Sequence, residues 1–410
     1  MTKKKKIFLI VAVTIVIFTL IILLLVPKIN NYIIKRKIAN AKILVELKGD
    51  LEIPFGTEVY AQDFISSING EILENKKIDT SSLGSKMVSF EYVNEDKITV
   101  PYQYEIKVID NTPPLIWLGN SYTVLTTFEG DLTDKIMCAD DLDDKPDCHI
   151  LGDYDTKTPG KYDLTFEAID KSGNKTTQPF TLIVKEPSKS NSNQNSASST
   201  LNGQKFADII ANYKTDQTKI GIDVSGWQGE IDFQKVKDAG VEFAFIKVGG
   251  TIGIDGKYYV DSKFKRNIEG FNEVGIPVGV YIYTYAKTTQ NARNDALWVM
   301  NEIKNYQVDL PIVYDWENWS FYNEFELSFN SLTNNAKIFF DTVEEKGYTG
   351  ALYSSKTYLE KIWQATERDI WLAHYTKQTS YEGSYKYWQM CDNGLVDGIN
   401  GYVDINIMYK

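Results

Sequence analysis

Two kinds of hydrophobic pattern divide this chain of 410 residues. In its first half, short segments alternate apolar and polar positions, as in 87–93, 102–109, 162–169 and 180–185. A period of two is typical of strands that have one face on a core. Asn-Gly, Ser-Gly-Asn and Pro-Gly turn signals separate these segments, so we expect an all-β region.

The all-β region contains an internal repeat. Residues 79–109 superpose on 155–185 at an offset of 76 without a gap, with an Asp-Thr pair, a glycine and a phenylalanine in register. A unit of this length with several short strands is typical of an immunoglobulin-like sandwich. We therefore expect two tandem immunoglobulin-like modules, at 43–111 and 112–186.

The pattern changes beyond the Ser/Asn-rich segment 187–203, which we interpret as a flexible linker. Apolar runs now alternate with segments of helical period, which is typical of β-α units around a parallel sheet. The runs predict eight strands, at 219–225, 243–249, 277–286, 310–318, 350–355, 369–376, 385–390 and 403–409. The intervening helices are predicted at 233–240, 261–275, 292–306 and 332–347.

The later connections between these strands are too short for full helices. We therefore expect 204–410 to form an irregular, TIM-like (β/α) barrel with eight strands and fewer helices. Such a barrel closes where its eighth strand pairs with the first.

A long apolar run lies near the start of the sequence. Residues 7–26 are twenty consecutive uncharged residues, the length that a helix needs to cross a bilayer. The basic segment 1–6 precedes them and predicts a cytoplasmic N-terminus, with the rest of the chain outside the cell. A cleaved signal peptide is the alternative, but the run is long for one and lacks a small-residue cleavage site. We favour an uncleaved, single-pass anchor in the cell membrane, followed by a juxtamembrane stalk at 27–42.

Charge follows the same division. Residues 1–50 carry ten Lys/Arg and two acidic residues, a net charge of +8, and the total of −11 leaves −19 for the rest. Because that remainder has no basic patch, we do not expect nucleic acid as a partner. Hydrophobic residues at 43% and aromatic residues at 13% disfavour a disordered chain or a polytopic membrane protein.

Three cysteines are too few for a disulfide-based scaffold. Cys138 and Cys148 are close enough in sequence to clip the loop between them, although spacing alone also allows two free thiols. We interpret Cys391 as a small buried hydrophobic residue.

The segment between Cys138 and Cys148 is rich in aspartate. Such side chains could bind Ca²⁺ through carboxylate oxygens, but their order is not that of an EF-hand, so we favour a solvated acidic loop. The aspartates are Asp140, Asp141, Asp143, Asp144 and Asp147.

Acidic residues lie where a barrel of this kind has its chemistry, at the C-terminal ends of the strands. Asp223 ends the first predicted strand, and Asp404 opens the eighth. Asp315 and Glu317 end the fourth and, being two residues apart, point to the same side of a strand. Adjacent carboxylates raise one another's pKa, which lets one hold a proton beside an ionised partner, as glycoside hydrolysis requires. Each acid alone could instead cap a helix, but four together favour an active site.

Other catalytic classes lack their residues in this sequence. His149 and His374 are the only histidines, so there is no HExxH motif or histidine cluster for zinc. The chain also lacks a GxSxG elbow, a phosphate-binding P-loop and a GxGxxG run after a strand. We expect no metal and no cofactor.

Aromatic residues on or just after the strands are candidates for sugar binding, because their rings can cover the flat C–H faces of sugars. Each one could instead serve barrel packing. The candidate substrate-binding residues are Trp227, Tyr283, Tyr353, Tyr375 and Trp388. Strand parity places Tyr314 and Trp316 on the opposite side from the two acids, where they would pack against helices.

Residues 218–410 resemble glycoside hydrolase family 25, the muramidases or lysozymes, which fold as an irregular barrel with eight strands. The resemblance is carried by GIDVSGWQG, PIVYDWEN, IWLAHY, KYWQM and GINGYVDINIM, in that order. It implies that Glu317 is the general acid/base and that Asp315 stabilises the oxocarbenium-like transition state or orients the substrate N-acetyl group. Asp223 and Asp404 would line the floor and tune Glu317.

Two points of this resemblance stay open. The nucleophile is either a carboxylate or the acetamido oxygen of the substrate, and both routes give retention. The chain also departs from many members at Lys247-Val248-Gly249-Gly250, where they have an Ala-Thr/Ser-Glu-Gly run. This departure concerns the contacts of that loop and none of the four acids.

The pattern TPGKYDLTFEAIDKSGN at 158–174 resembles bacterial immunoglobulin-like surface modules, which act as spacers or wall-binding units. Together these features predict a membrane-anchored, extracellular N-acetylmuramidase that hydrolyses peptidoglycan. Its expected partners are peptidoglycan glycan strands and, through the N-terminal helix, the membrane, and no protein partner is indicated. The alternative is a non-catalytic, wall-binding surface protein, against which the four intact acids argue.

Overall fold

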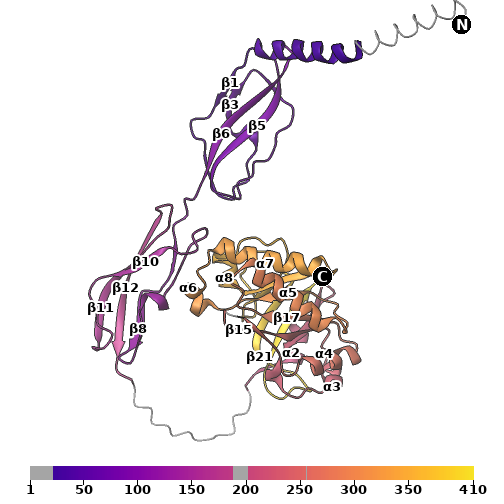
Figure 1. Cartoon of the computed structure of the whole chain (residues 1–410). Helices are drawn as coiled ribbons and strands as arrows, with labels where there is room; N and C mark the ends of the chain where they lie inside the picture. The colour runs from indigo at the N-terminus through magenta and orange to yellow at the C-terminus, as the bar shows by residue number, and fades with distance from the viewer. Residues whose placement is uncertain (1–21, 188–201, 255) are drawn as a thin grey trace, which may run out of the picture. The chain divides into compact units, whose positions relative to one another are not determined.

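A computed structural model describes residues 22–187, 202–254 and 256–410 of the chain (Figure 1). Contacts divide the chain into two compact units, Met1–Asn111 and Thr112–Lys410. Most of the predicted anchor at 7–26 and of the predicted linker at 187–203 lies outside the described residues. Residues 22–39 are helical, and in the described part of the chain no helix is both long and apolar enough to span a membrane.

The first unit is β-rich, as predicted. Its strands are β1 (Val45–Leu47), β2 (Glu52–Pro54), β3 (Ile65–Ile68), β4 (Gly70–Ile72), β5 (Gly84–Asn94) and β6 (Thr99–Ile109). They form a four-stranded sheet in the order β2-β6-β5-β4 and a two-stranded sheet of β1 and β3. The alternation in β5 buries Val88, Phe90 and Tyr92 on one face, because successive strand residues point to opposite sides.

The second unit opens with a β region of matching construction. Its strands are β7 (Leu115–Trp117), β8 (Ser121–Leu125), β9 (Met137–Ala139), β10 (Asp147–Leu151), β11 (Gly160–Ile169) and β12 (Lys175–Lys185). Again a four-stranded sheet, β10-β11-β12-β8, accompanies a two-stranded one, β7-β9. Because β11 and β12 each begin 76 residues after β5 and β6, the sequence repeat is also a repeat of structure. Its immunoglobulin-like identity stays a prediction.

All eight predicted strands of the C-terminal barrel are present. They are β14 (Thr218–Val224), β15 (Ala244–Ile252), β17 (Val278–Tyr283), β18 (Ile312–Asp315), β19 (Gly350–Ser355), β20 (Asp369–Ala373), β21 (Tyr387–Leu395) and β22 (Val403–Tyr409). Neighbours from β14 to β21 pair in parallel, and β22 closes the barrel by pairing antiparallel with both β21 and β14. The barrel and its closure are therefore confirmed.

The four predicted helices are also present, shifted by a few residues. They are α3 (Phe233–Asp238), α4 (Phe264–Glu273), α5 (Thr289–Ile303) and α7 (Phe329–Glu344). The structure adds short elements that the hydrophobic pattern did not reveal, because one or two turns carry too little periodicity. These are α2 (Phe206–Tyr213), α6 (Tyr322–Phe325), α8 (Lys356–Lys361), η3 (Gly226–Gln228), η4 (Trp319–Phe321), β13 (Gln204–Lys205) and β16 (Lys257–Val260).

Aromatic side chains fill the interior of the barrel. Phe245 on β15 stacks on Trp371 of β20 with ring centroids 4.4 Å apart, and Tyr387 of β21 meets Phe245 edge-on at 5.0 Å. Gly279 leaves room for this layer, since a Cβ atom there would lie 2.4 Å from the ring of Phe245. The filled interior leaves polar side chains only the end of the barrel.

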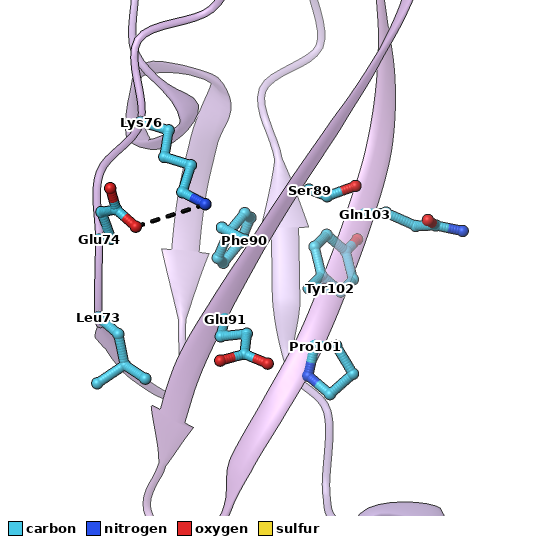
Figure 2. Close-up of a pocket in the computed structure, with 9 residues that line it drawn as sticks. All are labelled: Leu73, Glu74, Lys76, Ser89, Phe90, Glu91, Pro101, Tyr102 and Gln103. Carbon is cyan, nitrogen blue, oxygen red and sulfur yellow. Dashed lines mark ion pairs between the residues drawn. The ribbon is translucent and has the colours of Figure 1, made fainter.

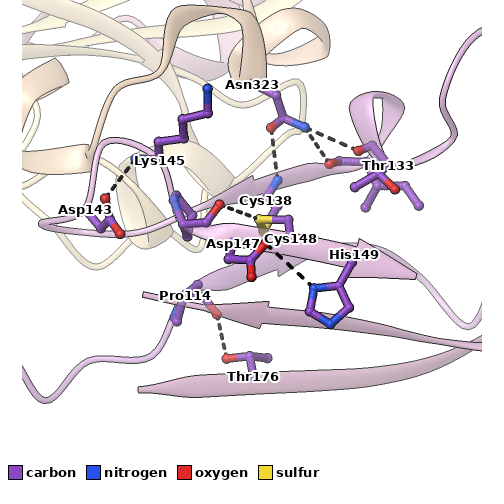
Figure 3. The surroundings of a disulfide bond; sticks show 12 residues. Pro114, Thr133, Cys138, Asp143, Lys145, Asp147, Cys148, His149, Thr176 and Asn323 are labelled. Atoms are coloured by element: carbon purple, nitrogen blue, oxygen red, sulfur yellow. Dashed lines mark hydrogen bonds and ion pairs between the residues drawn. A yellow bond between two sulfur atoms is a disulfide. The ribbon is translucent and has the colours of Figure 1, made fainter. Parts of the chain in front are cut away.

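The second β region packs directly on the barrel within the second unit. Met137 and Ala139 of β9 are buried in the same apolar core as the barrel helices. The neighbouring Cys138 is disulfide-bonded to Cys148, and Figure 3 shows Asn323 of the barrel against this bond. Cys391 is a free, buried cysteine.

The aspartate-rich loop is largely engaged by protein groups. The Asp140 carboxylate accepts hydrogen bonds from the backbone N–H groups of Leu142 and Asp143, and Asp143 pairs with Lys171. Asp144 reaches the barrel, where it accepts from the backbone N–H of Ser328 at 2.7 Å. The loop is therefore less solvated than the sequence suggested, because part of it is an interface.

The disulfide should stabilise the second unit measurably. Replacing both Cys138 and Cys148 by serine releases a loop that is closed in the unfolded chain, so we expect a loss of about 2–3 kcal/mol in the free energy of unfolding. Urea unfolding followed by tryptophan fluorescence measures it. Reduction of the unmodified chain should reproduce the loss and leave the double variant unaffected. An unfolding midpoint of the unmodified chain that does not change on reduction would contradict the expectation.

Candidate active site

A cavity of about 230 Å³ opens at the C-terminal ends of the barrel strands. All four acids predicted from the sequence line it, together with five uncharged residues. The lining consists of Asp223, Tyr281, Asp315, Glu317, Tyr353, Trp371, Tyr375, Gln389 and Asp404. The polar end of the barrel is thus a cluster of carboxyl groups enclosed by aromatic rings.

Strand register explains why these residues meet. Asp223 on β14 lies opposite Asp404 on the antiparallel β22. Asp315 at the end of β18 lies between Tyr283 of β17 and Tyr353 of β19 in the parallel ladder. Residues opposite each other on paired strands point to the same face, so the register alone brings these side chains to one end of the barrel.

A single amide, that of Gln389 on β21, organises one side of the cavity. Its Nε2 donates to Asp223 Oδ2 at 2.9 Å, and its Oε1 accepts from the hydroxyls of Tyr353 at 2.8 Å and Tyr375 at 3.0 Å. Because two hydroxyl donors fix the oxygen end, the NH₂ end must face the carboxylate.

A second amide completes the support of Asp223. Asn406 Nδ2 donates to the same Asp223 oxygen at 2.8 Å, and Asn406 Oδ1 accepts from the indole Nε1 of Trp371 at 2.7 Å. Both amides are buried. Asp223 is therefore held by a network whose outer members are aromatic side chains of the barrel interior.

The shared cavity raises the pKa values of its acids. Burial, and then the charge of Asp223, raises the pKa of Asp404 to about 9. Burial raises the pKa of Asp223 to about 6, and would raise it more without the hydrogen bonds from Asn406 and Gln389. Burial and the adjacent Glu317 raise the pKa of Asp315 well above its usual range. Near neutral pH the cluster therefore retains protons, as a general acid requires.

Glu317 differs from the other three acids because its side chain is exposed, while Asp315 directly before it on the same side is buried. Desolvation raises the pKa of Glu317, and hydrogen bonding to Asp315 and the positive charge of Lys247 oppose the rise. The Lys247 ammonium lies 5.0 Å from the ring centroid of Tyr283. Glu317 is thus the acid that a molecule entering the cavity can reach first.

The five aromatic candidates fare differently. Tyr353 and Tyr375 line the cavity, and Tyr283 stands beside Asp315 in the sheet and under Lys247. Trp227 is 92% exposed on η3, outside the cavity lining.

Trp388 was predicted to bind substrate, but its side chain is buried in the core between the barrel strands and the outer helices. Its Nε1 donates to the carbonyl of His374 at 2.8 Å, and its ring meets Tyr213 edge-on. It neighbours the inward-pointing Gln389 on β21, so alternation along the strand turns Trp388 outward.

Outward packing of two other aromatics was predicted from parity and is observed. Tyr314 contacts Phe339 of α7 with centroids 5.2 Å apart, and Trp316 contacts Phe325 of α6 at 4.9 Å. The same alternation turns Asp315 and Glu317 to the cavity.

Besides the predicted Tyr353 and Tyr375, the site has uncharged members that the substrate-binding candidates did not include, namely Tyr281, Trp371, Gln389 and Asn406. Two of them carried a usable signal. Asn406 follows Asp404 by two residues and so shares its side of β22, and Tyr281 shares the side of Tyr283 on β17. Neither Trp371 nor Gln389 lies two residues from an acid of the site, so alternation does not mark them.

The first unit has a larger hollow of different character. It measures about 730 Å³ and lies over β5 and β6, where Figure 2 shows Glu74 and Lys76 as an ion pair near Phe90 and Tyr102. Its other charged group is Glu91, and no cluster of buried acids lines it. The catalytic chemistry expected from the sequence therefore belongs to the barrel.

Comparison with known proteins relates the barrel to a family of glycosyl hydrolases. The model of glycosyl hydrolases family 25 matches residues 222–399, which include Asp223, Asp315 and Glu317, and Asp404 follows directly after. An autolytic lysozyme of Clostridium acetobutylicum is 28% identical over 189 residues, covering 45% of this chain and 54% of the relative. The chain thus spans about half the length of that protein.

Two further relatives differ in how far they extend. The uncharacterized protein YegX of Escherichia coli is 32% identical over 197 residues, covering 46% of this chain and 68% of the relative. The solved structure of the modular autolysin LytC from Streptococcus pneumoniae, in complex with a synthetic peptidoglycan ligand, is 25% identical with a TM-score of 0.43, covering 60% of this chain and 56% of LytC. On the family match and the relationship to YegX, the chain belongs to glycosyl hydrolase family 25.

Proposed function

We propose that the barrel is an N-acetylmuramidase, a lysozyme that cleaves the β-1,4 bond between N-acetylmuramic acid and N-acetylglucosamine in peptidoglycan. The observation that carries this proposal is the exposed Glu317 above buried carboxyl groups in one cavity. The relatives named autolytic lysozyme and Lysozyme M1, the latter from Streptomyces globisporus, support the choice of substrate.

Glu317 is the general acid/base in this mechanism. Its carboxyl proton passes to the glycosidic oxygen as the bond to the anomeric carbon breaks, so the leaving sugar departs as an alcohol. In the second half of the reaction the carboxylate takes a proton from the attacking water. Desolvation raises the pKa of Glu317, which favours the protonated form that donates, and its exposure lets it reach the oxygen.

The remaining acids act on the charge that develops at the anomeric carbon. Asp315, directly below Glu317, is placed to stabilise an oxocarbenium-like transition state or to orient the N-acetyl group of the substrate. Asp223 and Asp404 form the floor of the cavity beneath the reacting sugar. Tyr353 and Tyr375 offer rings to the sugar while their hydroxyls keep Gln389 oriented.

Glu317→Gln should abolish hydrolysis but leave glycan binding intact. Because the amide cannot donate a carboxyl proton, we expect the release of N-acetylmuramic acid reducing ends from peptidoglycan to fall at least about 100-fold. Mass spectrometry of the fragments measures it, and sedimentation with insoluble peptidoglycan measures binding. Glu345→Gln, at an exposed position that ends α7, is the matched control.

The same assay separates the two candidate functions. Undiminished release by Glu317→Gln would remove Glu317 from the mechanism. An unmodified chain that binds peptidoglycan but releases no reducing ends would instead favour the non-catalytic wall-binding protein.

Clustering these acids should make stability depend on pH. The pKa of Asp404 is about 9 in the folded chain and ordinarily 3.8, so between these values the folded state binds a proton that the unfolded state has lost. The free energy of unfolding therefore falls as pH rises between these two values. Asp404→Asn removes that term, and we expect the variant to be about 1–2 kcal/mol more stable than the parent at pH 8 but less active.

Urea unfolding at pH 5 and pH 8 tests this expectation. Asp397→Asn, at an exposed position in the loop before β22, is the control and should follow the parent at both pH values. Parallel pH profiles for Asp404→Asn and the parent would show that Asp404 does not hold a proton in the folded chain.

We also propose, from the sequence alone, that residues 7–26 anchor the enzyme in the cell membrane with the barrel on the outer side. The twenty uncharged residues behind four lysines support this orientation. After cell fractionation, the chain should stay with the membrane through alkaline carbonate extraction, and a variant lacking 1–26 should not. Extraction of the full chain by carbonate would contradict an anchor.

A further inference from the structure

The second β region holds the segment that follows the catalytic strand. This segment, residues 316–331, begins directly after Asp315, includes Glu317 and ends in the first turn of α7. The backbone N–H groups of Phe329 and Asn330 donate to the carbonyls of Asp140 and Asp141 at 2.9 and 3.0 Å. These contacts place the disulfide-clipped loop directly on the barrel.

Side chains strengthen the same contact. Asn323 Oδ1 accepts from the backbone N–H of Cys138 at 3.1 Å (Figure 3), and its Nδ2 donates to the carbonyl of Ile136 at 2.9 Å. Lys145 pairs with Glu326 at 2.6 Å. The seam between the β region and the barrel is therefore held at backbone and side-chain level.

A cavity of about 260 Å³ lies in this seam. Trp117 of β7 and Tyr122 of β8 line it from the β region, and Trp319 of η4 and Tyr358 of α8 line it from the barrel. Its volume is close to that of the catalytic cavity. Neither part of the unit forms this cavity without the other.

The seam cavity is on the catalytic face of the barrel. Trp319 follows Glu317 by two residues, and Tyr358 lies in the helix that begins where β19 ends. Both are therefore at the same end of the barrel as the four acids. The charge of Glu317 contributes, after burial, to the raised pKa of Tyr358, which places the ring within electrostatic range of the acid.

The lining combines ring faces with polar groups. Tyr358 stacks on Trp319 with centroids 3.9 Å apart and meets Trp117 at 5.2 Å, forming one continuous aromatic wall. Asp134, Lys135 and Ser320 supply polar atoms around it. Sugar rings present apolar C–H faces and a rim of hydroxyl or amide groups, so a wall of this kind is complementary to an N-acetylhexosamine.

We infer that the seam cavity is a glycan subsite, which binds an N-acetylhexosamine of the same strand whose bond is cut at Glu317. The inference rests on the proposed function, because it assumes a β-1,4-linked glycan as substrate. It gives the second β region a part in substrate binding, in addition to any role as a spacer.

Binding of a chitin hexasaccharide to the full chain tests the subsite. Glu317→Gln serves as the parent, so that the ligand stays intact during calorimetry. We expect Trp117→Ala to raise the dissociation constant about tenfold, and Trp117→Phe, which keeps a ring, to restore most of the affinity. Ser320→Trp, which fills the cavity from the barrel side, should weaken binding as well.

Controls separate a subsite from simple packing of the seam. Lys145→Ala removes an ion pair of the seam without touching the cavity lining, so it should leave the dissociation constant within about twofold. Thermal unfolding of each variant verifies that the unit is folded. Unchanged affinity in both Trp117→Ala and Ser320→Trp, or an equal loss in Lys145→Ala, would overturn the inference.

The outcome also stays distinct from that of the proposed function. If the chain cleaves peptidoglycan but its affinity for the hexasaccharide is the same in Trp117→Ala and Ser320→Trp, the muramidase proposal stands and the subsite is excluded. A chain that binds through these residues but cleaves nothing would retain the subsite and lose the muramidase.

Discussion

The active site at the end of the barrel depends on holding four carboxyl groups in one cavity against desolvation and mutual repulsion. Taken out of water, each would give up its charge, as the raised pKa values of Asp315 and Asp404 indicate. Asp223 is the exception that is supported directly, because two amides donate to one of its oxygens. The two amides beside Asp223 therefore serve to keep one carboxylate ionisable among neighbours that retain protons.

That electrostatic arrangement rests on packing. Asn406 is oriented by the indole of Trp371, and the indole is fixed by its stack on Phe245 inside the barrel. Gln389 is oriented by the hydroxyl of Tyr353 on β19 and by that of Tyr375, which follows β20. A change in the apolar interior would thus reach the acids through one aromatic ring and one amide, which is the usual dependence of a site on the groups behind it.

Much of this could be predicted from the sequence, because strands and acids carry local signals. Eight apolar runs gave the barrel, and alternation turned Asp315 and Glu317 inward. Alternation, applied to β21 as well, would also have turned Trp388 outward, since Gln389 beside it faces Asp223. Gln389 and Trp371 themselves could not be found, because an uncharged residue becomes part of a site only through partners on other strands.

The packing of the second β region on the barrel could not be predicted from the sequence either, since it joins residues almost two hundred positions apart. This packing nevertheless buries apolar side chains and adds hydrogen bonds to the barrel. Met137 and Ala139 are buried with the barrel helices, and Asp144 accepts a hydrogen bond from the backbone N–H of Ser328, the N-cap residue of α7. A barrel cut away at residue 204 would expose that apolar surface and lose the hydrogen bond from Ser328 to Asp144, beside the segment that carries Glu317. By its contacts, the compact unit that carries the catalytic site is therefore 112–410. The hydrophobic pattern of the sequence had separated the second β region from the barrel.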